Sequence, residues 1–100
     1  MLDKLKELSL RYQELEQKIQ DPGFMASKNE YAAALKEMGS LGRKVEKYRE
    51  YEAILKTIDE AREMASQETD AGIVELATEE LAEFEEKEQV LLRELKEMMV

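Results

Sequence analysis

The stretch LGRKVEKYREYEAILKTI, residues 41–58, decides the fold because its large apolar residues recur in steps of three or four. Residues spaced in this way share one face of a helix. The members of the stripe are Leu41, Val45, Tyr48, Tyr51, Leu55 and Ile58. The stripe extends backwards through Met38 and Leu35 to Tyr31, so the sequence predicts one long helix over about residues 28–66.

Two further stripes flank this long helix. The first contains Leu5, Leu8, Tyr12, Leu15 and Ile19; the second contains Val74, Ala77, Leu81, Phe84, Glu88, Leu91, Leu95 and Met98. They predict helices over about residues 2–20 and 71–99, and three amphipathic helices bury their apolar faces against one another. The predicted fold class is therefore all-α, an elongated, coiled-coil-like antiparallel three-helix bundle. Residues 1–100 are expected to form a single helical domain.

The connections between the predicted helices carry clear boundary signals. The triplet Asp21-Pro22-Gly23 ends the first helix because proline cannot continue the hydrogen-bond ladder and disfavours helix before itself. Residues 24–28 are expected to be the connection. The expected N-terminal caps are Ser27 or Asn29 for the second helix and Thr69 or Asp70 for the third.

Gly39 and Gly42 fall inside the predicted long helix. Two glycines in mid-helix cost about 2 kcal/mol relative to alanine. One interpretation is a weak spot or short break in the helix. The other is a close approach of backbones where the three helices overlap.

Antiparallel packing can be tested by arithmetic on residue numbers. Residues of the first and second helices should pair when their numbers sum to about 49, and those of the second and third when they sum to about 138. Apolar residues then meet apolar residues at nearly every step, which supports the helix assignment. Examples are Leu15 with Leu35, Tyr12 with Met38, Phe84 with Leu55 and Val74 with Met64.

Glu88 is the one acidic residue in a predicted apolar stripe. A buried carboxylate is costly unless it is paired. The same arithmetic places Glu88 beside Glu50, Arg49 and Tyr51, so we expect an ion pair with Arg49 or a hydrogen bond with the Tyr51 hydroxyl. The other glutamates between residues 79 and 86 suggest a solvated helix face more strongly than a catalytic or metal site.

Composition excludes most kinds of chemistry. The chain has no cysteine and no histidine, which removes disulfides, thiolate nucleophiles and histidine ligands or bases. No phosphate loop or dinucleotide turn is present. We expect no cofactor, no metal and no enzymatic activity. No apolar run approaches the roughly 20 residues of a membrane span, and residues 1–20 are too charged for a signal peptide. The missing cysteines are compatible with the expected cytoplasmic location.

The net charge of −9 argues against a dedicated nucleic-acid binder, and no DNA partner is expected. The charge is uneven, at −7 over residues 70–100 and −2 over residues 1–69. One basic cluster stands out, namely Arg43, Lys44, Lys47 and Arg49. It is either ordinary solvated charge or a contact for RNA or protein. Arg43 and Lys47 should project to the solvated side, and we take Arg43, Lys44 and Lys47 as candidate contact residues.

Several segments resemble the N-terminal domain of bacterial class I peptide chain release factors. They are LSLRYQEL (8–15), QDPGF (20–24), KEMGSL (36–41), YREY (48–51), IDEAREM (58–64) and ETDAGIVELATEELAEFEE (68–86). The resemblance favours the type that reads UAA and UAG. The sister type, which reads UAA and UGA, usually has a Phe-Trp pair where this chain has Gly23-Phe24-Met25. Gly39 and Gly42 depart from the family pattern.

The resemblance implies a docking role in translation termination. In the family, peptide release depends on a Gly-Gly-Gln loop, and stop-codon reading by this type depends on a Pro-x-Thr tripeptide; this chain contains neither. It is therefore expected to be the N-terminal domain of a larger factor whose later domains are absent. By analogy, it braces the factor on the ribosome at the stalk base of the large subunit. Ribosomal RNA is a further candidate partner, and no membrane is involved.

Two alternatives belong to other functional classes. One is a free-standing coiled-coil adaptor or chaperone-like protein-binding module. The other is a carboxylate-bundle metalloenzyme, which the missing histidines disfavour because such bundles use Glu-x-x-His steps. A Gly-Gly-Gln motif in sequence following residue 100 would favour the release-factor interpretation, and ribosome pelleting would separate docking from an adaptor role.

Overall fold

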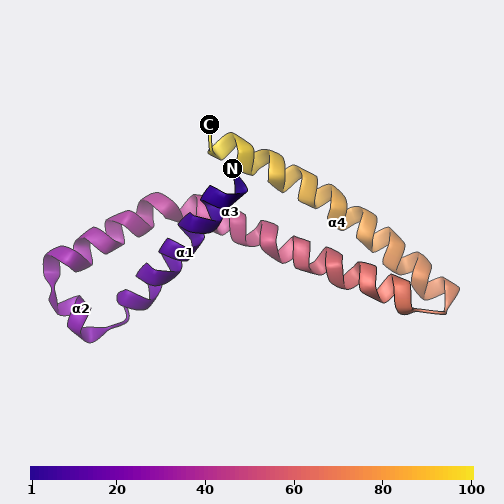
Figure 1. The fold of residues 1–100 in the computed structure, drawn as a ribbon, viewed down its shortest axis with the longest axis horizontal. Coiled ribbons are helices and arrows are strands. Elements are labelled where there is room, and N and C mark those ends of the chain that lie inside the picture. Colours follow the sequence, from indigo (N-terminus) through magenta and orange to yellow (C-terminus); the bar gives the residue numbers. More distant parts are fainter. The chain divides into compact units, whose positions relative to one another are not determined.

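The computed structural model describes residues 1–100, and all of its regular elements are helices (Figure 1). They are α1 (Leu2–Lys18), α2 (Pro22–Ala26), α3 (Lys28–Gln67) and α4 (Ala71–Met98). The predicted all-α class and the three long helices are confirmed. The chain forms two compact units, Met1–Arg49 and Glu50–Val100, and α3 contributes its first part to one unit and its second part to the other.

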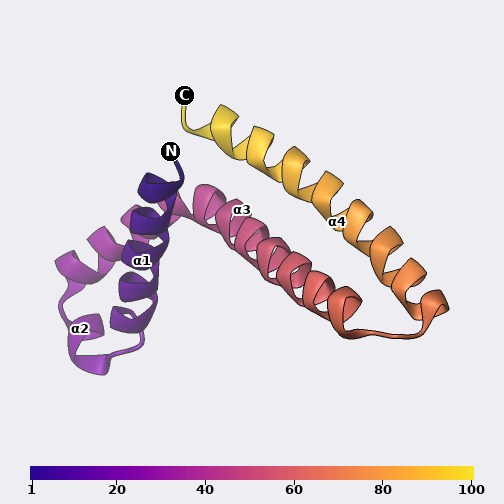
Figure 2. The same ribbon diagram turned by 45° about the vertical axis from the view of Figure 1, so that its right-hand side comes forward.

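In the first unit, α1 lies beside the first part of α3, and α2 connects them (Figures 1 and 2). The buried residues of this unit are Leu5, Leu15, Ala34, Val45 and Tyr48. The prediction that Leu35 belongs to the buried stripe is wrong, because Leu35 is exposed and Ala34 is buried. The inward face runs through residues 31, 34, 38, 41 and 45, so helical geometry selects the small Ala34 over its larger neighbour.

The short helix α2 corrects the prediction that residues 24–28 are only a connection. Pro22 stands in the first turn of α2, where its missing N–H costs nothing. The Asp21 carboxylate caps the same end by accepting a hydrogen bond from the Gly23 N–H at 3.3 Å. The rings of Phe24 and Tyr31 then meet edge to face at 6.5 Å, which ties α2 to the start of α3.

Helix α3 is continuous through Gly39 and Gly42, and neither glycine has a positive φ. The long continuous helix is therefore confirmed, and the interpretation of the two glycines as a short break is wrong. Close backbone approach is also wrong at Gly39, because a Cβ atom added there would meet nothing within 4 Å. A Cβ atom at Gly42 would lie 4.0 Å from the Tyr12 ring, which is ordinary van der Waals contact.

In the second unit, α4 runs antiparallel to the second part of α3 (Figures 1 and 2). The buried residues are Tyr51, Ile58, Ala77, Leu91 and Leu95. The Asp70 carboxylate caps α4 by accepting hydrogen bonds from the N–H groups of Gly72 at 2.8 Å and Ile73 at 3.2 Å. Asp70 was one of the two caps that the sequence predicted.

The predicted packing of Met64 against Val74 is wrong, because Met64 is 59% exposed. The face of α3 that is turned inward passes through Ile58, Ala61 and Ala65. As at Leu35, alanine occupies the inward position and the larger residue beside it points outward.

The two units differ strongly in charge. The first unit holds eight acidic and ten basic residues, a net charge of +2. The second holds sixteen acidic and five basic residues, a net charge of −11. The basic cluster and the acidic helix α4 therefore belong to units of opposite sign.

Candidate functional site

The basic cluster lies on α3 at the end of the first unit. Arg43 is exposed, as predicted, and Lys44 is half-buried. Lys47 was expected on the solvated side but is half-buried and interacts with another residue. Arg43 and Arg49 are thus the two exposed guanidinium groups of the cluster, and Lys44 is the neighbour of Arg43 in the sequence.

Arg49, the fourth base of the cluster, is committed to the packing of α1. Its guanidinium binds the Glu16 carboxylate, with Nη2 and Oε1 separated by 2.7 Å. Its Cζ atom also lies 5.3 Å from the centre of the Tyr12 ring, within the range of a cation–π contact. The sequence interpretation placed Arg49 with Glu88 and missed Glu16. No simple spacing rule pairs Glu16 with Arg49.

A second arginine clamp lies between the same helices. Arg11 on α1 donates to both carboxylate oxygens of Glu37 on α3, from Nε at 2.6 Å and from Nη2 at 2.9 Å. Arg11 also forms an ion pair with Glu14 at 3.3 Å. The residue numbers of Arg11 and Glu37 nearly satisfy the predicted antiparallel register, so this pair was accessible to sequence reasoning.

These contacts shift the acid–base equilibria of the carboxylates. The hydrogen bonds from Arg11 hold the pKa of Glu37 below its ordinary value of 4.5, and the positive charges of Arg11 and Lys18 add to the effect. The hydrogen bond from Arg49 lowers the pKa of Glu16 in the same way. Arg11 and Arg49 thus both hold α1 against α3 through carboxylates. Of the other bases in the cluster, Arg43 is exposed and Lys47 interacts within the fold.

Glu88 lies near Tyr51 in the second unit, as the register predicted. Burial raises the pKa of the Tyr51 hydroxyl, and the negative charge of Glu88 raises it further. Glu88 is half-buried. The expected hydrogen bond between the two groups is absent from the structure, and their relationship is one of repulsion between Glu88 and the ionised phenol.

The acidic run of α4 is mainly a solvated face. Glu79, Glu80, Glu83 and Glu86 are exposed, whereas Glu85 is half-buried and forms an ion pair with Arg62 at 3.2 Å. No group of three or more acidic residues is arranged to hold a metal ion. No helix is both long and apolar enough to cross a membrane. The arrangement can bind partners by charge and apolar contact.

Residues 8–100 match the PCRF domain, and the chain belongs to this family. Named relatives extend the match. The chain is 38% identical over all of its 100 residues to peptide chain release factor 1 of Caldicellulosiruptor saccharolyticus, and 39% identical to the protein of that name in Clostridioides difficile. The protein of that name in Clostridium novyi is 42% identical over 86 residues.

The chain spans about a quarter of the length of these relatives, 28% in the first two cases and 24% in the third. No solved structure matches the chain.

Proposed function

We propose that the chain is the N-terminal domain of a peptide chain release factor of the type that reads UAA and UAG, and that it docks the factor on the ribosome during translation termination. The observation that carries the proposal is the alignment of relatives named peptide chain release factor 1 over the whole chain. Peptide release and codon reading would reside in other domains, because this chain contains neither a Gly-Gly-Gln nor a Pro-x-Thr motif. The proposed role is therefore binding without chemistry, in the cytoplasm.

The basic cluster supports a contact with ribosomal RNA or with acidic protein at the stalk base of the large subunit. Arg43 is exposed, and its unit carries a net charge of +2 in a chain whose net charge is −9. Positive charge on that unit attracts phosphate and releases counterions when it binds. Arg43, Lys44 and Lys47 are the residues that we assign to this contact.

The test is co-sedimentation of the 100-residue chain with bacterial ribosomes over a series of salt concentrations. The double variant Arg43→Glu/Lys44→Glu should sediment less and show a flatter dependence on salt, because fewer counterions are released. Lys47 is left intact because it already interacts within the fold.

The matched control is Lys28→Glu/Lys36→Glu, which makes the same change of charge at two exposed bases of α3 outside the cluster. The control should retain the sedimentation of the unmodified chain. Equal losses in both variants would assign binding to net charge and remove the cluster from the proposal. If the unmodified chain does not sediment with ribosomes at low salt, the docking proposal fails. The adaptor alternative has no support from the family or from the relatives.

A further inference from the structure

A groove runs between α3 and α4 within the second unit. Its cavity has a volume of about 500 Å³. The floor is apolar and is formed by Ile54 of α3 with Val90 and Leu91 of α4. Val90 is exposed although it is a large apolar residue. The groove thus offers apolar surface that neither helix covers.

The same face continues along both helices toward the turn that joins them. Residues at steps of three or four share one face of a helix. On α4 the face that contains Val90 continues through Lys87, Glu83 and Glu80 to Leu76 and Ile73. On α3 the face that contains Ile54 continues through Thr57 and Ala61 to Met64. Leu76 is 66% exposed, and Ile73 and Met64 are exposed as well. From Ile73 to Val90 the strip is roughly 26 Å long, at 1.5 Å per residue.

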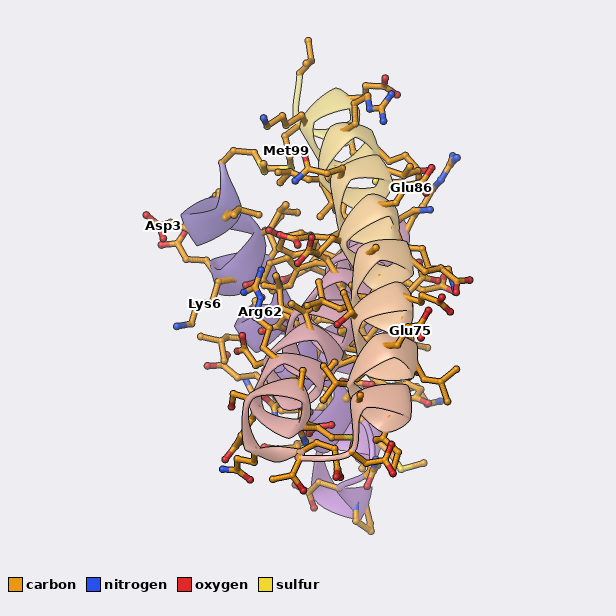
Figure 3. The ribbon with its side chains drawn as sticks, turned by 90° about the vertical axis from the view of Figure 1, so that its right-hand side faces the viewer. Asp3, Lys6, Arg62, Glu75, Glu86 and Met99 are labelled. Atoms are coloured by element: carbon orange, nitrogen blue, oxygen red, sulfur yellow. The ribbon has the colours of Figure 1, made fainter.

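The rim of the groove is acidic. Glu50, Glu83 and Glu86 line it with a single base, Lys87, which already forms an ion pair with Glu83 at 3.9 Å. Figure 3 shows Glu86 and Arg62 pointing to different sides of the α3–α4 pair, so the Arg62–Glu85 ion pair does not neutralise this rim. The unit as a whole has a net charge of −11.

We propose that this groove binds a lysine- and arginine-rich amphipathic helix of a partner protein. The apolar stripe of that helix fills the space between α3 and α4, and its bases pair with the acidic rim. A groove between two antiparallel helices is the shape that accepts a third helix, which anchors side chains at steps of three and four. The charge selects a basic partner, because like charges opposed across an interface are costly.

The charge also excludes the other classes of occupant. RNA and anionic lipid surfaces are repelled by an acidic rim. A second copy of the chain that placed the same face against this one would oppose two acidic rims. The groove has an acidic rim and lies in the second unit, whereas the basic cluster lies in the first unit. The two surfaces are therefore separate, and this proposal does not depend on ribosome docking.

The experiment measures binding of a fluorescently labelled synthetic peptide to the 100-residue chain by fluorescence anisotropy. The peptide is an amphipathic helix of about 18 residues, matched to the length of the strip, with leucine on one face and lysine and arginine on the other. A scrambled peptide of the same composition has the same charge but no apolar stripe. The designed peptide should bind at least about fivefold more tightly, because burying leucine surface adds to the charge attraction.

Two variants of the chain locate the binding site. Leu76→Ser should weaken binding of the designed peptide about tenfold, because a buried leucine contributes strongly to association. Its control is Leu10→Ser, which changes a 53% exposed leucine of the other unit. Glu83→Lys/Glu86→Lys should also weaken binding about tenfold at low salt, and its control is Glu52→Lys/Glu60→Lys, at exposed positions of α3 outside the groove.

Circular dichroism establishes that each variant remains folded, which is expected because all the substituted side chains are exposed. Equal affinity for the designed and scrambled peptides would overturn the proposal, since it would show attraction by charge alone. So would equal losses in the groove variants and their controls. Sedimentation equilibrium that showed a dimer dissociated by Leu76→Ser would overturn it in favour of a second copy of the chain.

Discussion

Arg11 and Glu37 face each other as a fork and a carboxylate, with Nε at 2.6 Å and Nη2 at 2.9 Å from the two oxygens of Glu37. The two residues are 26 positions apart in the sequence, so the contact fixes α1 against α3. Bidentate pairing of this kind specifies orientation as well as adding stability. It makes the first unit sensitive to acid.

Lowering the pH should destabilise the first unit through Glu37. The folded-state pKa of Glu37 is depressed, chiefly by its hydrogen bonds from Arg11. The stability that this shift contributes is therefore present above the ordinary pKa of 4.5 and is lost as the pH falls through the folded-state value. Thermal melts at a series of acidic pH values should show a smaller fall in melting temperature for Glu37→Gln than for the unmodified chain. Glu46→Gln, at an exposed glutamate of α3, should leave the fall in melting temperature unchanged.

The second unit should instead lose stability in alkali through Tyr51. Its folded-state pKa lies above 10.0 because of burial and the charge of Glu88. The stability that this pKa shift contributes is fully present below the pKa of tyrosine in the unfolded state. It is lost as the pH rises through the pKa of Tyr51 in the folded state. Glu88→Gln should shift the ionisation of Tyr51 to lower pH, measured by ultraviolet difference absorbance. An unchanged titration curve would show that burial alone sets the shift, and Glu86→Gln on the outer face is the control.

Replacing Gly39 with alanine should stabilise the chain by about 0.5–1 kcal/mol, because alanine loses less backbone entropy in a helix and a Cβ atom there meets nothing within 4 Å. Urea denaturation followed by circular dichroism measures the change. Gly72→Ala is the comparison. Its Cβ atom would lie 3.2 Å from the Asp70 carboxylate oxygen that caps α4, so little or no gain is expected. A loss of stability at Gly39 would contradict the open surroundings of that position.

Ile58→Ala should destabilise the second unit by about 2–5 kcal/mol, because the side chain is 2% exposed and its removal leaves a cavity. Met64→Ala removes a side chain of similar size that is 59% exposed and should change the unfolding free energy by less than about 0.5 kcal/mol. The two residues lie six positions apart in the same helix. Equal costs in a denaturant titration would contradict the assigned inward face.

Much of this fold follows from the spacing of apolar residues. Apolar residues spaced three or four positions apart predicted the three long helices, which the structure confirms. The antiparallel register also predicted that Glu88 lies near Tyr51. The pairing of Phe84 with Leu55 stays a prediction; both side chains are half-buried. The errors at Leu35 and Met64 have one cause. At both places a three- or four-residue step leads equally well to an alanine beside the larger residue, and the angular position on the helix decides which of the two points inward.

Other features could not be predicted from pattern alone. The triplet at Asp21–Gly23 signals the end of one helix and, equally, a cap and first turn of the next, and the sequence interpretation used only the first meaning. The engagement of Arg49 with Glu16 and Tyr12 depends on long side chains that reach across the packing, which residue spacing does not encode. The partial burial of Lys47 was missed for the same reason.

The difference in charge between the two units has a consequence for how each responds to salt. In the second unit sixteen acidic residues outnumber five basic ones, so repulsion between like charges weakens its folded state at low ionic strength. The first unit, at +2, carries little repulsion of this kind. Salt at physiological strength screens exposed charges beyond roughly 8 Å. Added salt should therefore stabilise Glu50–Val100 more than Met1–Arg49.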